Sequence, residues 1–191
     1  MELTLIIHKR FVELALLLAN SDGELQKIEE EEINKYIPEE ISLSENNKII
    51  KESKENLNNN KLSYSSSIKE LNELCNKAEK ISVITNLFKI IAVDGVVVNE
   101  EIDLLKNISN ALLIENSLFD SIKEKLLLNV SVESFSNLLV DNQLSEKDLK
   151  IELKKEFTKW NNRLNTLPPG IERDNAQTII NNITNRLIEL N

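Results

Sequence analysis

Glycine and proline are both scarce in this sequence, and their scarcity excludes several classes of fold. Each occurs three times among 191 residues. Hairpins and β-sandwiches need many turn residues, and dinucleotide- or phosphate-binding loops need clustered glycines. With 41% hydrophobic and 29% charged residues, the chain has the composition of a globular domain and not of a disordered one. We therefore expect an all-α protein.

Cysteine, histidine and long apolar runs are also scarce. Cys75 is the only cysteine, so no intramolecular disulfide can form, which is typical of a reducing compartment. His8 is the only histidine and no hydrolase motif accompanies it, so we expect no enzymatic activity. No apolar run approaches the roughly 20 residues that a membrane span needs, and the N-terminus lacks the features of a signal peptide. We expect a cytoplasmic protein.

Acidic side chains outnumber basic ones by 32 to 23, which gives a formal net charge of −9. Because phosphate backbones repel such a chain, direct binding to nucleic acid is disfavoured. The acidic excess is concentrated in residues 22–40, which carry eight acids and two lysines, whereas residues 145–191 carry a net charge of +1. A nucleic-acid adaptor acting through that last segment stays open as a weaker alternative.

Apolar residues recur at helical spacing along most of the chain. Ser67 and Glu70 have the spacing of a capping box, so we expect a helix to begin at Ser67 and to carry one apolar stripe as far as Ile91. Other helices are predicted over residues 3–20, 28–36, 44–56, 100–113, 117–129 and 132–140.

Two parts are predicted from this pattern. Residues 1–140 form a helical domain, within which the asparagine- and serine-rich segment 56–67 is predicted to be a flexible loop. Residues 141–191 form a helical hairpin whose turn lies at Pro168-Pro169-Gly170. Whether the helices pack within one chain or across an oligomer stays open.

A short pattern occurs twice. Residues 16–25 and 88–97 each hold the apolar end of a helix, an Asp-Gly pair and a short apolar step. An acidic helix start follows each copy, Glu31-Glu32-Ile33 in the first and Asn99-Glu100-Glu101-Ile102 in the second. In this alignment the first copy carries three additional residues between the glycine and the acidic pair.

The repeat resembles the TerB-like domain of tellurite resistance proteins, which also occurs in the DjlA co-chaperones. The resemblance spans roughly residues 4–140 and is strongest over 88–126. The chain departs from the family pattern where Leu113 replaces a helix-ending glycine, in the insertion of the first copy, and in the spacing between the copies. The resemblance implies an all-α bundle with two pseudo-symmetric Asp-Gly helix-turn-helix units, followed here by the C-terminal hairpin.

The resemblance also implies an acidic surface that binds a divalent cation, Ca²⁺ or Mg²⁺, and such hard cations prefer oxygen ligands. An EF-hand is excluded, because Leu18 and Ile90 would occupy the first ligand position. Structural roles compete with metal binding, since acids are favoured in a first helical turn and aspartate is common before glycine. The candidate ligands are Asp22, Glu24, Glu31, Glu32, Asp94, Glu100, Glu101 and Asp103.

The function implied by the resemblance is that of a non-enzymatic adaptor in a bacterial stress-response or antiphage defence system. Its partner would be another protein, such as an ATPase or helicase of the same system. An alternative is a degenerate co-chaperone, because residues 153–160 and 176–183 resemble two helices of a J domain. The His-Pro-Asp motif of a J domain is replaced by Asn165-Thr166-Leu167, and this alternative predicts contact with an Hsp70 chaperone.

Overall fold

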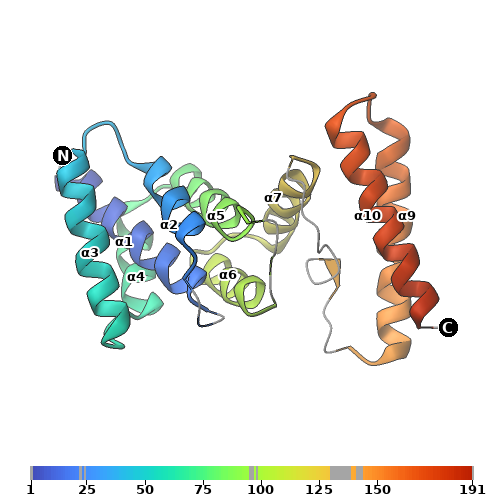
Figure 1. Cartoon of the computed structure of the whole chain (residues 1–191), viewed down its shortest axis with the longest axis horizontal. Helices are drawn as coiled ribbons and strands as arrows, with labels where there is room; N and C mark the ends of the chain where they lie inside the picture. The colour runs from blue at the N-terminus through green and yellow to red at the C-terminus, as the bar shows by residue number, and fades with distance from the viewer. Residues whose placement is uncertain are drawn as a thin grey trace. The chain divides into compact units, whose positions relative to one another are not determined.

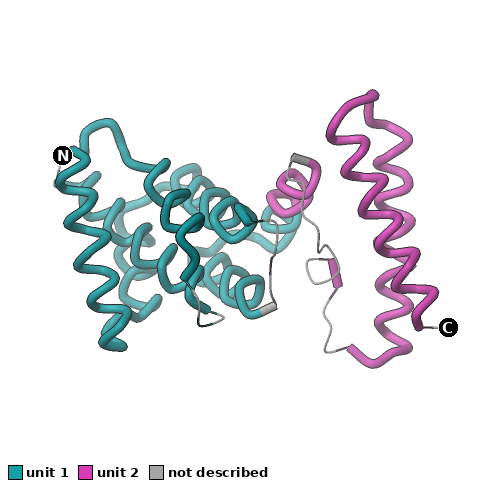
Figure 2. Tube along the Cα trace, viewed as in Figure 1, with its two compact units in different colours: residues 1–94, 100–120 teal, residues 95–99, 121–191 magenta. Residues whose placement is uncertain are grey.

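The computed structural model describes residues 2–21, 23, 25–94, 97, 99–129, 139–140 and 144–190, and within these ranges it is helical without strands. The predicted all-α class is confirmed. The chain divides into two compact units, residues 1–94 with 100–120 and residues 95–99 with 121–191 (Figure 2). The boundary expected between residues 140 and 141 is a prediction that this division leaves open.

Helix α1 (Glu2–Ala19) lies at the centre of the first unit (Figure 1). It packs against α3 (Leu43–Asn58), α4 (Tyr64–Leu74) and α5 (Lys77–Ile91). Leu14, Leu16 and Leu18 are completely buried in this helix. Each buried leucine contributes about 1.5–3 kcal/mol to folding through removal of apolar surface from water. Burial on several sides of α1 therefore makes it the core helix of this unit.

The remaining helices of the first unit follow the two Asp-Gly segments. Helix α2 (Lys27–Ile33) and the 3₁₀ helix η1 (Asn34–Tyr36) come after the first, and α6 (Asn99–Ala111) comes after the second. Helix α7 (Asn116–Asn129) begins in this unit. Its Phe119 packs on Phe88 of α5 with 5.1 Å between ring centroids, which joins α7 to the core.

The segment between α3 and α5 differs from the sequence prediction in two ways. The connection between α3 and α4 is limited to residues 59–63, because α3 continues to Asn58 and α4 already begins at Tyr64. The stripe expected to continue unbroken to Ile91 is divided at Asn76, whose side chain accepts hydrogen bonds from the backbone N–H groups of Ala78 and Glu79. This N-cap starts α5 as a separate helix.

The second unit contains the predicted C-terminal hairpin. Its helices are α9 (Glu146–Thr166) and α10 (Ile171–Glu189), joined at Pro168-Pro169-Gly170. Trp160 of α9 is buried, and Ile179 and Ile183 of α10 are buried in the same unit. Asn175 Nδ2 donates a hydrogen bond to the Leu128 carbonyl at 3.0 Å, so the C-terminal part of α7 belongs with this hairpin. Among the described helices, none is long and apolar enough to cross a membrane.

Candidate functional site

The segments that follow α1 and α5 lie together in the first unit. Gln26, directly before α2, donates a hydrogen bond from its side-chain Nε2 to Oδ2 of Asp94 at 3.1 Å. The two residues are 68 positions apart in the chain. Helix α2 also packs against α5. The structure therefore brings Gln26, which follows the first Asp-Gly pair, to Asp94 of the second, in agreement with the pairing of the two units that the family resemblance implies. Asp22 and Glu24, two of the predicted ligands, lie outside the described residues.

The two copies of the repeat have the same spacing where their second helices begin. Helix α2 starts at Lys27 and α6 starts at Asn99, in each case the fourth residue after the glycine. The three-residue insertion predicted for the first copy is therefore wrong, because no extra residue separates its glycine from the start of α2. The error has a physical reason: residues 29–32 are all glutamate, so hydrophobic pattern alone cannot select the acid that matches the second copy.

Glu29 and Glu101 are the equivalent acids in the two copies. Each is the third residue of its helix, and each is only 4% exposed. Glu29 accepts a hydrogen bond from the backbone N–H of Gln26 at 2.8 Å, which satisfies one of the free N–H groups at the start of α2. Sequence analysis did not select Glu29, although both glutamates stand six residues after a glycine. That equal spacing was the available signal.

Two further predicted ligands on α2 have nearby cationic partners. Glu31 is exposed and lies 3.4 Å from the ammonium group of Lys27. Glu32 is buried and accepts hydrogen bonds from Lys35 and from the hydroxyl of Tyr36. Burial opposes the charged form of Glu32, but the two hydrogen bonds together with the positive charges of Lys35 and Lys89 outweigh burial and hold its pKa below the usual value. In this arrangement Glu32 anchors η1 to α2.

The other predicted ligands belong to the second copy. Glu100 and Asp103 are exposed on α6, whereas Glu101 is buried and Asp94 is half-buried. Within the described ranges, no three histidine, cysteine, aspartate or glutamate side chains are placed to hold a metal ion. The described carboxylates alone therefore do not form a complete cation site. A site built on these turns would also need ligands from Asp22 or Glu24.

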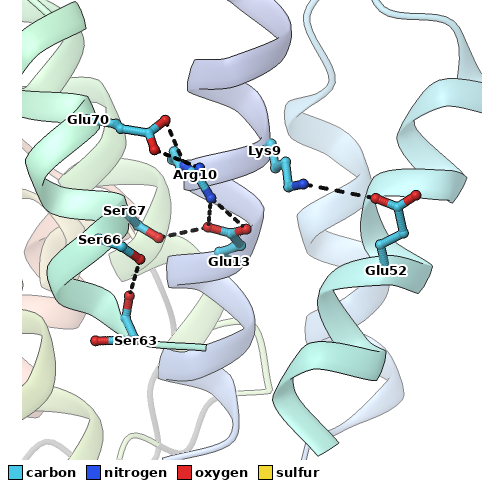
Figure 3. A network of polar contacts seen from close by, with 8 residues as sticks. All are labelled: Lys9, Arg10, Glu13, Glu52, Ser63, Ser66, Ser67 and Glu70. Carbon is cyan, nitrogen blue, oxygen red and sulfur yellow. Dashed lines mark hydrogen bonds and ion pairs between the residues drawn. The ribbon is translucent and has the colours of Figure 1, made fainter. Parts of the chain in front are cut away.

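A polar network joins α1 to α4 (Figure 3). Arg10 binds both oxygens of Glu70, at 2.7 and 3.0 Å, and also binds the buried Glu13. Ser67 donates its hydroxyl to Glu13 at 2.8 Å. The predicted capping box is wrong, because Ser67 lies inside α4 and both members of the pair instead contact α1. The guanidinium of Arg10 holds the pKa of Glu70 below its usual value.

Comparison with known proteins addresses the N-terminal two thirds of the chain. A family model described as "Tellurite resistance protein TerB" matches residues 8–124. The match includes both Asp-Gly segments and the helices that follow them. No curated protein and no solved structure matches the chain. The α9–α10 hairpin lies outside the matched residues, so its resemblance to a J domain stays a prediction.

Proposed function

From the premise that the chain belongs to the TerB family, we propose that it is a non-enzymatic interaction module that docks onto another protein. The docking site is the surface formed by the two Asp-Gly segments and the helix starts after them, which we name the turn surface. Its exposed or half-buried described acids are Glu31, Asp94, Glu100 and Asp103, and Asp22 and Glu24 extend it in sequence.

The observation that carries this proposal is the hydrogen bond between Gln26 and Asp94. It places residues from the two copies of the repeat within 3.1 Å, although they are far apart in sequence. In this proposal the acids of the two segments, each of which is a common turn residue by itself, form one surface. Residues 22–40, which contain the first of these turns, carry a net charge of −6 in sequence, although Glu29 and Glu32 among them are buried. A concentrated negative potential of this kind favours a partner with a basic surface and speeds its association.

The partner class follows from family membership and from charge. We propose a protein with a basic docking face, such as an ATPase or helicase that acts with this chain in a bacterial stress-response or antiphage defence system. Lysine- and arginine-rich faces are common on proteins that bind nucleic acid. An acidic adaptor can occupy such a face without binding nucleic acid itself.

A divalent cation, Ca²⁺ or Mg²⁺, is the second component of the proposal. Carboxylates are the ligands that these hard cations prefer. Asp94 sits beside the start of α2, where the buried Glu29 accepts the backbone N–H of Gln26, and Glu101 is buried at the equivalent position of α6. These residues support a cation site on the turn surface, in which Asp22 and Glu24 supply the further ligands. A bound cation would reduce repulsion among the acids.

Differential capture tests the docking proposal. The full chain is used as bait in a lysate of its host, beside a variant with Asp22→Asn and Asp94→Asn. The matched control is Glu55→Gln with Glu73→Gln, which removes the same charge from exposed sites on α3 and α4. We expect a protein retained by the wild type and the control and lost at least tenfold with the turn variant. Equal capture by all three baits would contradict the proposal.

Thermal melting tests the cation. The chain is melted in chelator and then with Ca²⁺, Mg²⁺ or Mn²⁺. A cation at about 100 times its dissociation constant adds about 2.7 kcal/mol, which for a chain of this size raises the melting temperature by about 5–10 °C. We expect Asp94→Asn to abolish the rise, because an amide keeps the acceptor for Gln26 but loses the charge. A rise of equal size in that variant, or none in the wild type, would contradict a cation at the turns.

A further inference from the structure

A second region of the first unit, lined by none of the predicted metal ligands, contains a cavity of about 440 Å³. It lies between the N-terminal half of α1, the N-terminal half of α5 and residues 36–38. Its volume is within the range of roughly 300–1,000 Å³ that is usual for small-molecule pockets. The cavity belongs to one compact unit and is therefore defined by a single packed core.

The walls of the cavity are mainly apolar and aromatic. Ile7 and Phe11 of α1 and Val83 of α5 line it. Tyr36 packs edge-on against Phe11, with 6.0 Å between ring centroids and an interplanar angle of 80°. The chain has only eight aromatic residues, so two at one small cavity are a local enrichment of aromatic side chains. Such walls favour a ligand with a flat apolar body.

His8 supplies a polar atom in this apolar lining. Its ring is 3% exposed and lies 6.3 Å from the ring of Phe11. A chain of hydrogen bonds fixes which ring nitrogen carries the proton. Asn34 donates its side-chain N–H to the Glu30 carbonyl at 2.9 Å, and a carbonyl can only accept. The side-chain oxygen of Asn34 must therefore be the acceptor for the next residue in the chain.

That next residue is Asn46, whose Nδ2 donates to the oxygen of Asn34 at 2.8 Å. The Asn46 oxygen is then the atom that faces Nε2 of His8 at 2.7 Å, and it requires Nε2 to be the donor. In a neutral imidazole the other nitrogen, Nδ1, is consequently an acceptor. No residue in the described part of the chain donates a hydrogen bond to Nδ1. Burial lowers the pKa of His8 and so favours this neutral form.

We propose that this cavity binds a small, uncharged, largely aromatic molecule that donates one N–H or O–H to Nδ1 of His8. The apolar walls would hold the body of the molecule, and the imidazole acceptor would set its orientation. A charged ligand is disfavoured because its charge would be desolvated against Ile7, Phe11 and Val83. Glu79 also lines the cavity, but its carboxylate accepts the backbone N–H of Asn76 at 2.7 Å and caps α5. The proposal uses none of the acids of the turn surface, so failure of one proposal leaves the other standing.

Indole and 1-methylindole form the matched pair of probes for this proposal. They share an apolar two-ring body, and only indole has an N–H. Because the chain has one histidine, its ring ¹⁵N signals need no assignment by mutation. We expect indole to shift the Nδ1 signal of the full chain in a saturable way. Loss of one neutral hydrogen bond should weaken 1-methylindole about 2- to 10-fold.

A variant that fills the cavity gives an independent readout. Ser82 is exposed on α5 and lines the cavity, so Ser82→Trp should occupy the mouth without disturbing the core. Ser44→Trp, on the exposed surface of α3, is the matched control because Ser44 does not line the cavity. We expect Ser82→Trp to weaken indole binding at least tenfold and Ser44→Trp to leave it unchanged, with both variants folded by far-ultraviolet circular dichroism.

Three results would overturn the inference. The first is the absence of any saturable Nδ1 shift with indole at millimolar concentration. The second is equal affinity for indole and 1-methylindole, which would remove the role of His8 as an acceptor. The third is unchanged indole binding in a folded Ser82→Trp variant, which would place the ligand elsewhere. The probe pair decides the question even if the tryptophan variant does not fold.

Discussion

At the residue scale, Lys9 and Arg10 are neighbouring cations on α1 with very different surroundings (Figure 3). Lys9 faces Glu52 across 3.9 Å, and both side chains are about two fifths exposed. Arg10 instead binds Glu13, whose side chain is 5% exposed, and at the same time holds Glu70 with two hydrogen bonds. Solvent screens the Lys9–Glu52 pair, whereas the Arg10–Glu13 pair includes a buried carboxylate.

Replacement of these two residues by methionine should therefore have unequal effects. In the part of the chain that the structure describes, Arg10→Met leaves the buried Glu13 carboxylate with the Ser67 hydroxyl as its remaining side-chain hydrogen-bond donor, and we expect the free energy of unfolding to fall by about 3 kcal/mol. Lys9→Met should lower it by less than about 1 kcal/mol. Urea unfolding of both variants measures the difference. Similar losses in the two variants would show that the network does not stabilise the α1–α4 contact.

His8 predicts a pH dependence of stability. Burial lowers its pKa below the ordinary value of about 6.5, with the hydrogen bond to Asn46 acting in the opposite direction. The folded state therefore holds His8 neutral at pH values where the unfolded chain already binds a proton. Stability from this residue is complete above pH of about 6.5 and declines as the pH falls below it. An NMR titration of the single histidine should give a pKa below about 6.5, and a value above it would contradict this account.

At the element scale, the end of α6 contains a residue in an unfavourable conformation. Leu113 has a φ of +63°, and the N–H groups of Leu113 and Ile114 bond back to the carbonyls of Asn110 and Ser109. These are the two hydrogen bonds of a Schellman motif, in which glycine usually occupies the left-handed position. Leu113 is 78% exposed, so packing of its side chain contributes little stability to offset the backbone strain.

Leu113→Gly should consequently stabilise the protein. Relief of the left-handed strain is worth about 1–2 kcal/mol, and the extra freedom of glycine in the unfolded chain offsets about 0.5–1 kcal/mol of it. We expect a net gain of about 0.5–1 kcal/mol, measured by urea unfolding. Leu113→Val, which keeps an apolar side chain but adds branching at Cβ, should instead be destabilising. A loss of stability with glycine would contradict the assignment of strain to this position.

The helices show which features the sequence could predict. Apolar periodicity predicted the C-terminal hairpin and the other helical segments that the structure describes, because burial of one helix face leaves a regular pattern. The helix expected over 132–140 lies mostly outside the described residues. The sequence pattern failed at Asn76 and at Ser67, since capping and tertiary contact use the same polar residue types. The same limit applies to the candidate site: among four consecutive glutamates the hydrophobic pattern did not select Glu29, which the start of α2 and its spacing from Gly23 identify. The Asp-Gly pairs themselves were recognisable because turn chemistry is local.

At the scale of the whole molecule, the family match and the two compact units divide the chain differently. Residues 8–124 carry the TerB match, while the second unit takes residues 121–129 of α7 together with the hairpin. Lys159 of α9 binds Glu124 of α7 at 2.6 Å, which supports that assignment within the second unit. Within the second unit, the hairpin thus contacts the C-terminal part of α7.

The central claim is that the two Asp-Gly segments act as one site. Substoichiometric Mn²⁺ tests it directly, because this ion broadens the backbone amide signals of residues close to where it binds. We predict that the signals of residues 20–26 and 92–98 broaden together at the lowest Mn²⁺ concentration, and that Asp94→Asn removes the effect from both segments. Broadening confined to one segment, or spread evenly over other exposed acids such as Glu39 and Glu55, would contradict the claim.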